Sequence, residues 1–153
     1  MRLIIKILVV LVILFIAIQF IPSTQNVGGK GLATDISKSL IMPNKIQSVF
    51  ENACYDCHSD NTNYPWYSKI QPVRWMMDRH VKEGKEEINF SEFGSYSTRS
   101  KVSKLKAIAH SIQHNDMPLS SYRLMHKSAN LSEAEKKLIV NWALQTSDSL
   151  SAR

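Results

Sequence analysis

The stretch Cys54-Tyr55-Asp56-Cys57-His58 constrains the fold of this chain more than any other. It contains the only two cysteines of the sequence, separated by two residues, and a histidine follows the second cysteine directly. This order is the pattern by which haem c is attached: the two thiols add to the vinyl groups, and the imidazole is held against the iron. We therefore predict that Cys54 and Cys57 bind one covalent haem c and that His58 is the proximal iron ligand.

Three other kinds of site also use a Cys-x-x-Cys pair. A thioredoxin-like dithiol would be surrounded by a βαβ pattern, which the flanking sequence does not show. A zinc site would need further ligands at matching spacing, and there is no second cysteine pair. A disulfide this short would close almost no loop and stabilise little. None of the three explains His58 as well as haem attachment does.

The first 21 residues form a separate apolar segment. Leu3 to Ile21 comprises 19 residues, and a helix of that length spans roughly 28 Å, close to the thickness of a bilayer core. Arg2 and Lys6 at its start predict that the amino end stays in the cytoplasm. The alternative is a cleaved signal peptide, but small residues typical of a cleavage site are missing around Gln19–Pro22. We expect a single-pass anchor in the inner membrane, with the remainder at the periplasmic face.

The charge of the chain bears on its partners. The formal net charge is +6, of which Arg2 and Lys6 supply two, so +4 remains on the exported part. This excess is too small and too scattered to indicate nucleic-acid binding. It agrees with a lysine-bearing face that docks an acidic redox protein.

Composition divides the remainder into a tether, one domain and a tail. Residues 22–41 hold three glycines among polar residues without a sustained period, as expected of a flexible tether. Residues 42–146 are predicted to form one all-α domain, and the polar residues 147–153 are expected to fray.

Helical periodicity supports the all-α prediction. Before Cys54, one helix face is formed by Ile46, Val49, Phe50 and Ala53. Val73–Gly84 and Val102–Ile112 repeat the helical period, and Ser132 opens a last helix with a capping-box pattern. By composition, the stretches 59–70 and 89–100 are loops, and the aromatic residues of the first are expected to pack.

Two side chains compete as the iron ligand opposite His58. Met117 lies 59 positions after His58, and Pro118 biases it to an extended backbone at a helix end. A lone methionine is otherwise core filler. His80 lies on the apolar face of its predicted helix, where a histidine is otherwise a hydrogen-bonded core residue. We predict Met117 as the distal ligand and keep His80 as the alternative.

Together these residues resemble a small class I cytochrome c, in which the first and last helices cross. Phe50 and Trp142 are the candidates for that crossing. The chain is more closely similar to the bacterial haem-binding domain family of membrane-anchored, single-haem proteins. The matching stretches are Ala53–Ser59, Tyr64–Tyr67, Ile70–Val73, His80–Gly84, Asn89–Ser91 and Met117–Tyr122. Unlike ordinary class I cytochromes, this chain has Ser59-Asp60-Asn61 in place of a glycine-rich turn and an additional helix, which carries His80.

The resemblance implies haem but little about the electron donor or acceptor. We expect a membrane-anchored, monohaem c-type cytochrome that carries single electrons between redox partners, and not an enzyme. Met/His ligation would stabilise ferrous iron and raise the potential. Two alternatives stay open. A peroxidase-like haem enzyme would need an open iron position and an acid/base residue, for which His80 or His114 could serve. A haem-based sensor or an assembly module is the other.

Overall fold

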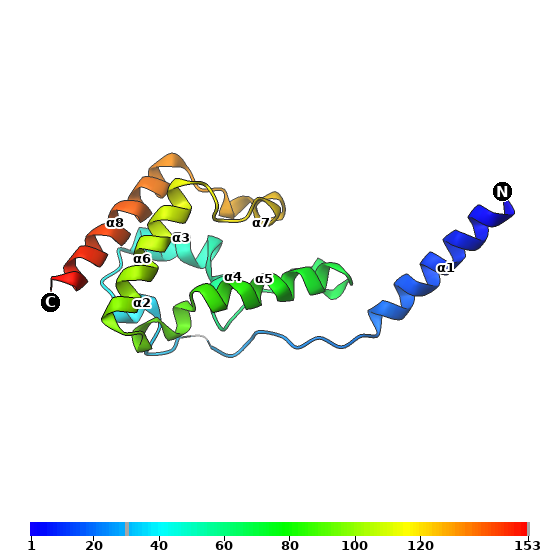
Figure 1. Ribbon diagram of the computed structural model, residues 1–153, viewed down its shortest axis with the longest axis horizontal. Coiled ribbons are helices and arrows are strands. Elements are labelled where there is room, and N and C mark those ends of the chain that lie inside the picture. The colour runs from blue at the N-terminus through cyan, green and yellow to red at the C-terminus, as the bar shows by residue number, and fades with distance from the viewer. Residues whose placement is uncertain (30, 153) are drawn as a thin grey trace.

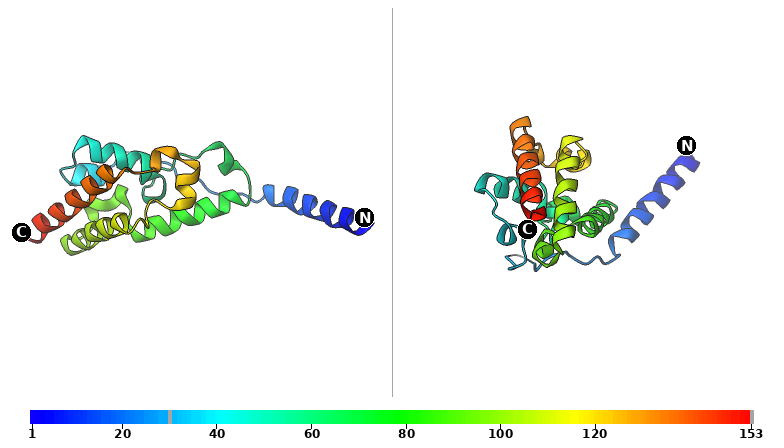
Figure 2. Two further views of the ribbon diagram at one scale, coloured as in Figure 1. Left: turned by 90° about the horizontal axis from the view of Figure 1, so that it is seen from above. Right: turned by 60° about the vertical axis from the view of Figure 1, so that its left-hand side comes forward.

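The computed structural model describes residues 1–29 and 31–152, and all regular structure in these residues is helical (Figure 1). The all-α prediction is thereby confirmed. The α-helices are α1 (Arg2–Gln19), α2 (Ile36–Ser39), α3 (Asn44–Ala53), α4 (Tyr55–His58), α5 (Val73–Glu87), α6 (Thr98–Gln113), α7 (Ser120–Met125) and α8 (Glu133–Ser151). Short 3₁₀ helices are η1 (Trp66–Lys69), η2 (Phe90–Ser95) and η3 (Lys127–Ala129). Figures 1 and 2 show α1 extending away from the other helices.

The domain core forms where α3 meets the pair of long helices α6 and α8, which lie side by side (Figure 1). The ring of Phe50 meets the edge of Trp142 at a centroid distance of 5.7 Å. The indole Nε1 of Trp142 also donates a hydrogen bond to the carbonyl oxygen of Ile41, at 3.0 Å. The predicted contact between the first and last domain helices is therefore present.

The core contains the residues that periodicity marked before Cys54 and others that periodicity missed. All four residues predicted on the apolar face of α3 are buried. Phe90 and Phe93 are also buried, although their segment was predicted as a loop; η2 turns both rings inward. Phe90 lies 5.2 Å from Phe50, between centroids. In the other predicted loop, Tyr64 and Tyr67 are half-buried, whereas Trp66 is exposed, so the expected packing holds only in part.

The last helix begins where its capping pattern predicts and ends later than expected. The Ser132 hydroxyl accepts a hydrogen bond from the Glu135 backbone N–H, and the Glu135 carboxylate accepts one from the Ser132 N–H at 2.8 Å. The Ser132 hydroxyl also donates to the Glu135 carboxylate at 2.6 Å, and this bond, followed by the one from the Ser132 N–H, lowers the pKa of Glu135. The tail that was expected to fray is helical to Ser151, because the buried Ser147 keeps this part of α8 against the domain.

The segment 22–41 differs from the flexible tether that its composition suggested. Ile36 is fully buried in the core, and Asp35 accepts hydrogen bonds from the Tyr55 hydroxyl at 2.7 Å and from the backbone N–H of Ser37. The Asn26 amide donates to the carbonyl oxygen of Ser59 at 2.8 Å. Polar residues can signal a loose linker, but here they pair with groups of the domain and hold the segment against it.

Two isoleucines of this segment provide a direct test. Replacing Ile36 by alanine should lower the free energy of unfolding by roughly 2–5 kcal/mol, because it empties a fully buried site. Ile41→Ala is the matched control, since Ile41 is almost fully exposed. Urea unfolding followed by circular dichroism measures both. Equal, small effects would mean that the segment does not pack on the domain.

Candidate functional site

A cavity of about 570 Å³ opens among α3, α4, α5, α6 and the start of α7. Three of its lining residues come from the Cys-x-x-Cys-His stretch, and the others are mostly apolar. The residues that matter for the argument are Cys54, Cys57, His58, His80, Gly84 and Met117. The structure thus brings every residue of the sequence-based site to one cavity.

The two cysteines are free thiols on the wall of this cavity. Burial, and to a lesser extent the neighbouring Cys57, raises the pKa of Cys54 to about 12. Burial and the charge of Asp56 raise the pKa of Cys57 to about 11. Redox dithiols of the thioredoxin kind depend on a lowered thiol pKa. The environment of this pair is therefore unlike that of a redox dithiol.

The imidazole of His58 is oriented by the end of α5. Its Nδ1 lies 2.8 Å from the carbonyl oxygen of Gly84 and 3.2 Å from that of Ile88. Both partners are acceptors, so Nδ1 carries the proton and Nε2 keeps its lone pair. Burial lowers the pKa of His58, which leaves the ring neutral at pH 7. A histidine that binds a metal is usually a neutral imidazole whose other ring nitrogen donates a hydrogen bond to a carbonyl or carboxylate oxygen.

Gly84 permits the close approach of α5 to α4. A Cβ atom at this position would lie 2.7 Å from the carbonyl oxygen of Cys57, closer than real Cβ contacts. The helix that Gly84 contacts, α4, carries Cys57 and His58. Without the close approach, the carbonyl oxygens of α5 would not reach His58.

Met117 and His80 enter the cavity from different elements. Met117 precedes the buried Pro118 after the end of α6, and its backbone N–H donates to the carbonyl oxygen of Ser111 at 3.3 Å. His80 comes from the middle of α5. His114 is exposed and does not line the cavity, which removes it as an acid/base residue there.

The residues Cys54–His58 are called here the attachment stretch. The two residues between its cysteines bind this stretch to other parts of the chain, a role that the spacing alone could not reveal. Tyr55 donates its hydroxyl proton to Asp35. Asp56 accepts a hydrogen bond of 2.6 Å from the Tyr122 hydroxyl and one of 2.9 Å from the Asn63 backbone N–H. Burial, followed by the bond to Asp56, raises the pKa of Tyr122, so its hydroxyl remains a donor.

His126 was also missed by sequence reasoning, since it belongs to no recognisable pattern. Its ring stacks on Tyr122 at a centroid distance of 4.0 Å, and its Nε2 lies 3.2 Å from the Tyr67 hydroxyl. The ring thereby joins α7 to η1 beside the cavity. It is a positioning residue for Tyr122, whose side chain lines the cavity.

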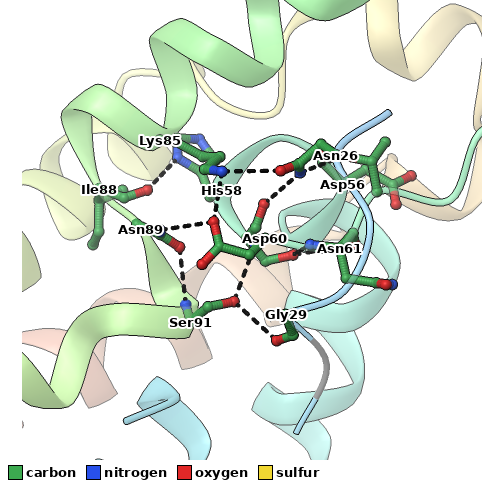
Figure 3. Close-up of polar contacts among 12 residues, drawn as sticks. Asn26, Gly29, Asp56, His58, Asp60, Asn61, Lys85, Ile88, Asn89 and Ser91 are labelled. Carbon is green, nitrogen blue, oxygen red and sulfur yellow. Dashed lines mark hydrogen bonds and ion pairs between the residues drawn. The ribbon is translucent and has the colours of Figure 1, made fainter. Parts of the chain in front are cut away.

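Asp60, two residues after His58, anchors a second polar cluster (Figure 3). Its carboxylate forms an ion pair with Lys85 at 2.5 Å and accepts a hydrogen bond from the Asn89 amide at 3.0 Å. Its backbone N–H donates to Ser91, and Lys85 also donates to Asn26. This cluster joins Asp60 to the last turns of α5 through Lys85, and to the start of η2 through Asn89 and Ser91.

A sequence model of the haem-binding domain family matches residues 13–145. Because this match covers most of the chain, the chain belongs to the haem-binding domain family. Comparison with curated proteins and with solved structures found no match.

The residues at the cavity agree with haem as the bound group. The volume of the cavity lies within the range of roughly 300–1,000 Å³ that is usual for ligand and cofactor sites. Its lining is mainly apolar and carries two thiols, a neutral imidazole and a thioether. Imidazole and thioether are both axial ligands of haem iron in proteins.

The glycine at the α4–α5 contact gives a test of this geometry. Gly84→Ala should lower the free energy of unfolding by roughly 1–3 kcal/mol, because the new methyl group overpacks the contact with Cys57. Lys82→Ala, an exposed change on the same helix, is the control. Urea titrations of both variants measure the difference. If Gly84→Ala is no more destabilising than the control, α5 does not lie against α4 as described.

Proposed function

We propose that this protein is a membrane-anchored, monohaem c-type cytochrome that carries single electrons between redox proteins at the periplasmic face. The observation that carries the proposal is the placement of Cys54, Cys57 and His58 on the wall of one apolar cavity. Two thioether bonds would hold the haem, and Nε2 of His58 would bind the iron. The bound haem would supply the one-electron couple of its iron.

The protein's own groups have three tasks in this proposal. The carbonyl oxygens of Gly84 and Ile88 keep the Nε2 lone pair of His58 directed at the cavity. The bonds of Tyr55 and Asp56 hold the attachment stretch in place during electron transfer. The apolar lining excludes water, which helps to set the potential. None of these tasks requires a proton transfer, which agrees with the proposed role as an electron carrier.

Met117 is proposed as the distal ligand, with His80 as the alternative. The break between α6 and α7 places Met117 outside regular helical packing, at the cavity. A thioether ligand gives a higher potential than a second imidazole would. His80 also supports a second candidate function, because a histidine at the cavity could act as acid/base group in a peroxidase-like enzyme.

Two single variants distinguish the ligands and the two functions. Met117→Ala should abolish the weak sulfur-to-iron charge-transfer band of the ferric protein, lower the potential and allow carbon monoxide to bind the ferrous form. His80→Ala is the matched control and should leave the band in place. An inert, six-coordinate wild-type iron supports the electron carrier. A wild-type protein that lacks the band, or that binds carbon monoxide readily, would contradict Met117 ligation and favour the enzyme or a sensor.

Helix α1 is proposed as the membrane anchor. It has 18 residues and a mean hydropathy of 2.6 in its most apolar window, and a helix of this length spans roughly 27 Å. None of its residues is buried against the domain. Its charged residues are Arg2 and Lys6, so its amino end is expected on the cytoplasmic side.

The anchor predicts the form in which the mature protein is recovered. Residues 1–21 should be retained, the protein should sediment with membranes, and detergent should be needed to release it. Intact-mass determination of the purified chain measures the retained segment. A soluble form that begins near Pro22 would show instead that α1 is a cleaved signal peptide.

A further inference from the structure

The chain leaves an unusual group of apolar side chains exposed close to the end of α1. Beyond residue 33, eight large apolar side chains of the described chain are exposed, and half of them lie between positions 66 and 76. Their exposed fractions are 74% for Trp66, 38% for Ile70, 39% for Trp75 and 48% for Met76. These four residues, called here the junction patch, belong to η1, the turn after it and the first turn of α5.

Hydrogen bonds tie the junction patch to the carboxyl end of α1. The Gln19 side chain donates to the carbonyl oxygen of Gln71 at 3.2 Å and accepts from the Gln71 backbone N–H at 2.9 Å. Gln19 is the last residue of α1, and Gln71 directly follows Ile70. A second tie runs from the Arg74 guanidinium to the carbonyl oxygen of Thr24, at 2.5 Å.

We propose that the junction patch docks on the lipid surface and lies in the interfacial layer of the membrane that α1 spans. The proposal rests on the proposed anchoring by α1. The polar layer beside a bilayer core of roughly 30 Å is about 5–8 Å thick. Trp75 is the third residue of α5, so it lies roughly 3 Å along the helix axis from Val73, which follows Gln71 by two residues. The patch is therefore within reach of this layer when Gln19 lies at the core boundary.

The chemistry of the patch is that of a membrane interface. Tryptophan is enriched at both membrane–water boundaries, where its ring lies at the level of the headgroups. The exposed Lys69, next to Ile70 of the patch, suits the phosphate groups of the lipids, whereas Arg79 is paired with Glu83 at 2.7 Å. Arg74 is instead buried, and it pairs with Asp78 at 2.7 Å as well as with Thr24.

This docking would fix the orientation of the haem cavity. Helix α5 carries Trp75 and Met76 of the junction patch at its amino end. Near its carboxyl end it carries Gly84, which lies against Cys57. With its first turn held at the lipid surface, α5 can no longer swing about the end of α1. The cavity would then lie at a constant distance from the membrane surface, where membrane-bound redox partners could reach it.

Spin labels on introduced cysteines test the proposal in the full chain. With Cys54 and Cys57 held as thioethers, Trp66→Cys and Ile70→Cys each add one free thiol. Leu144→Cys is the matched control, because Leu144 is also 38% exposed and lies on α8, at the end of the molecule opposite α1 (Figure 1). Val10→Cys reports on the anchor itself.

The full-length variants are placed in vesicles of equal parts phosphatidylcholine and phosphatidylglycerol. Power saturation compares the collision of each label with oxygen, which concentrates in the bilayer, and with a water-soluble nickel chelate. Baselines under nitrogen are subtracted, so relaxation by the haem iron cancels. The haem absorption spectrum of each labelled chain checks that it is folded.

The labels at positions 66 and 70 should show an oxygen-to-nickel ratio several-fold above that of the control at 144 and below that at position 10. If the labels at 66 and 70 match the control while the label at 10 lies in the bilayer, the docking is wrong and the anchoring stands. If the label at 10 also lies in water, both the anchoring and the docking are overturned.

Discussion

The hydrogen bonds from Nδ1 of His58 to the carbonyl oxygens of Gly84 and Ile88 are the contact on which the site depends. They fix the protonated nitrogen of the ring and leave Nε2 free to bind a metal. For these bonds to form, α5 must lie against the attachment stretch, and only glycine at position 84 leaves room for the carbonyl oxygen of Cys57. The ion pair between Lys85 of α5 and Asp60, two residues after His58, adds a second contact between α5 and this part of the chain.

The attachment stretch is held by elements from across the chain. Tyr55 is bonded to Asp35 in the segment before α3, and Asp56 is bonded to Tyr122 on α7. A covalent cofactor would fix the cysteines and the histidine, but not the backbone between them. These two bonds supply that restraint. They also explain why the segment before α3 and the short helix α7, neither of which was predicted as an ordered element, have defined positions.

The sequence predicted the structure correctly where a short pattern determines local structure, as in a helix face or a helix cap. The apolar spacing before Cys54 predicted the buried face of α3, and Ser132 with Glu135 predicted the start of α8 through a capping box. Haem as the cofactor could be predicted because the Cys-x-x-Cys-His pattern is specific to it, and the chain belongs to the haem-binding domain family.

Sequence patterns failed where order depends on partners far along the chain. Residues 22–41 are polar and glycine-rich, and nothing local reveals that Asn26 and Asp35 have partners in the domain. Phe90 and Phe93 are one turn of a 3₁₀ helix apart, but a single such spacing within the six residues of η2 is too short a pattern to predict a helix. His126 owes its place to Tyr122 and Tyr67, which are brought to it only by the fold. Both Met117 and His80 line the cavity, as their positions in the sequence predicted, but the sequence does not decide which of them would bind the iron.

Covalent attachment of one haem to Cys54 and Cys57, in the cavity beside His58, is tested by acid extraction of the denatured protein followed by intact-mass measurement. The haem should stay on the wild-type chain, which should be heavier by one haem, with the added mass on the peptide that contains residues 54–58. The Cys54→Ala/Cys57→Ala double variant should release all of its haem into the organic phase. Free extraction of haem from the wild type, or covalent haem on the double variant, would show that these cysteines do not hold the haem.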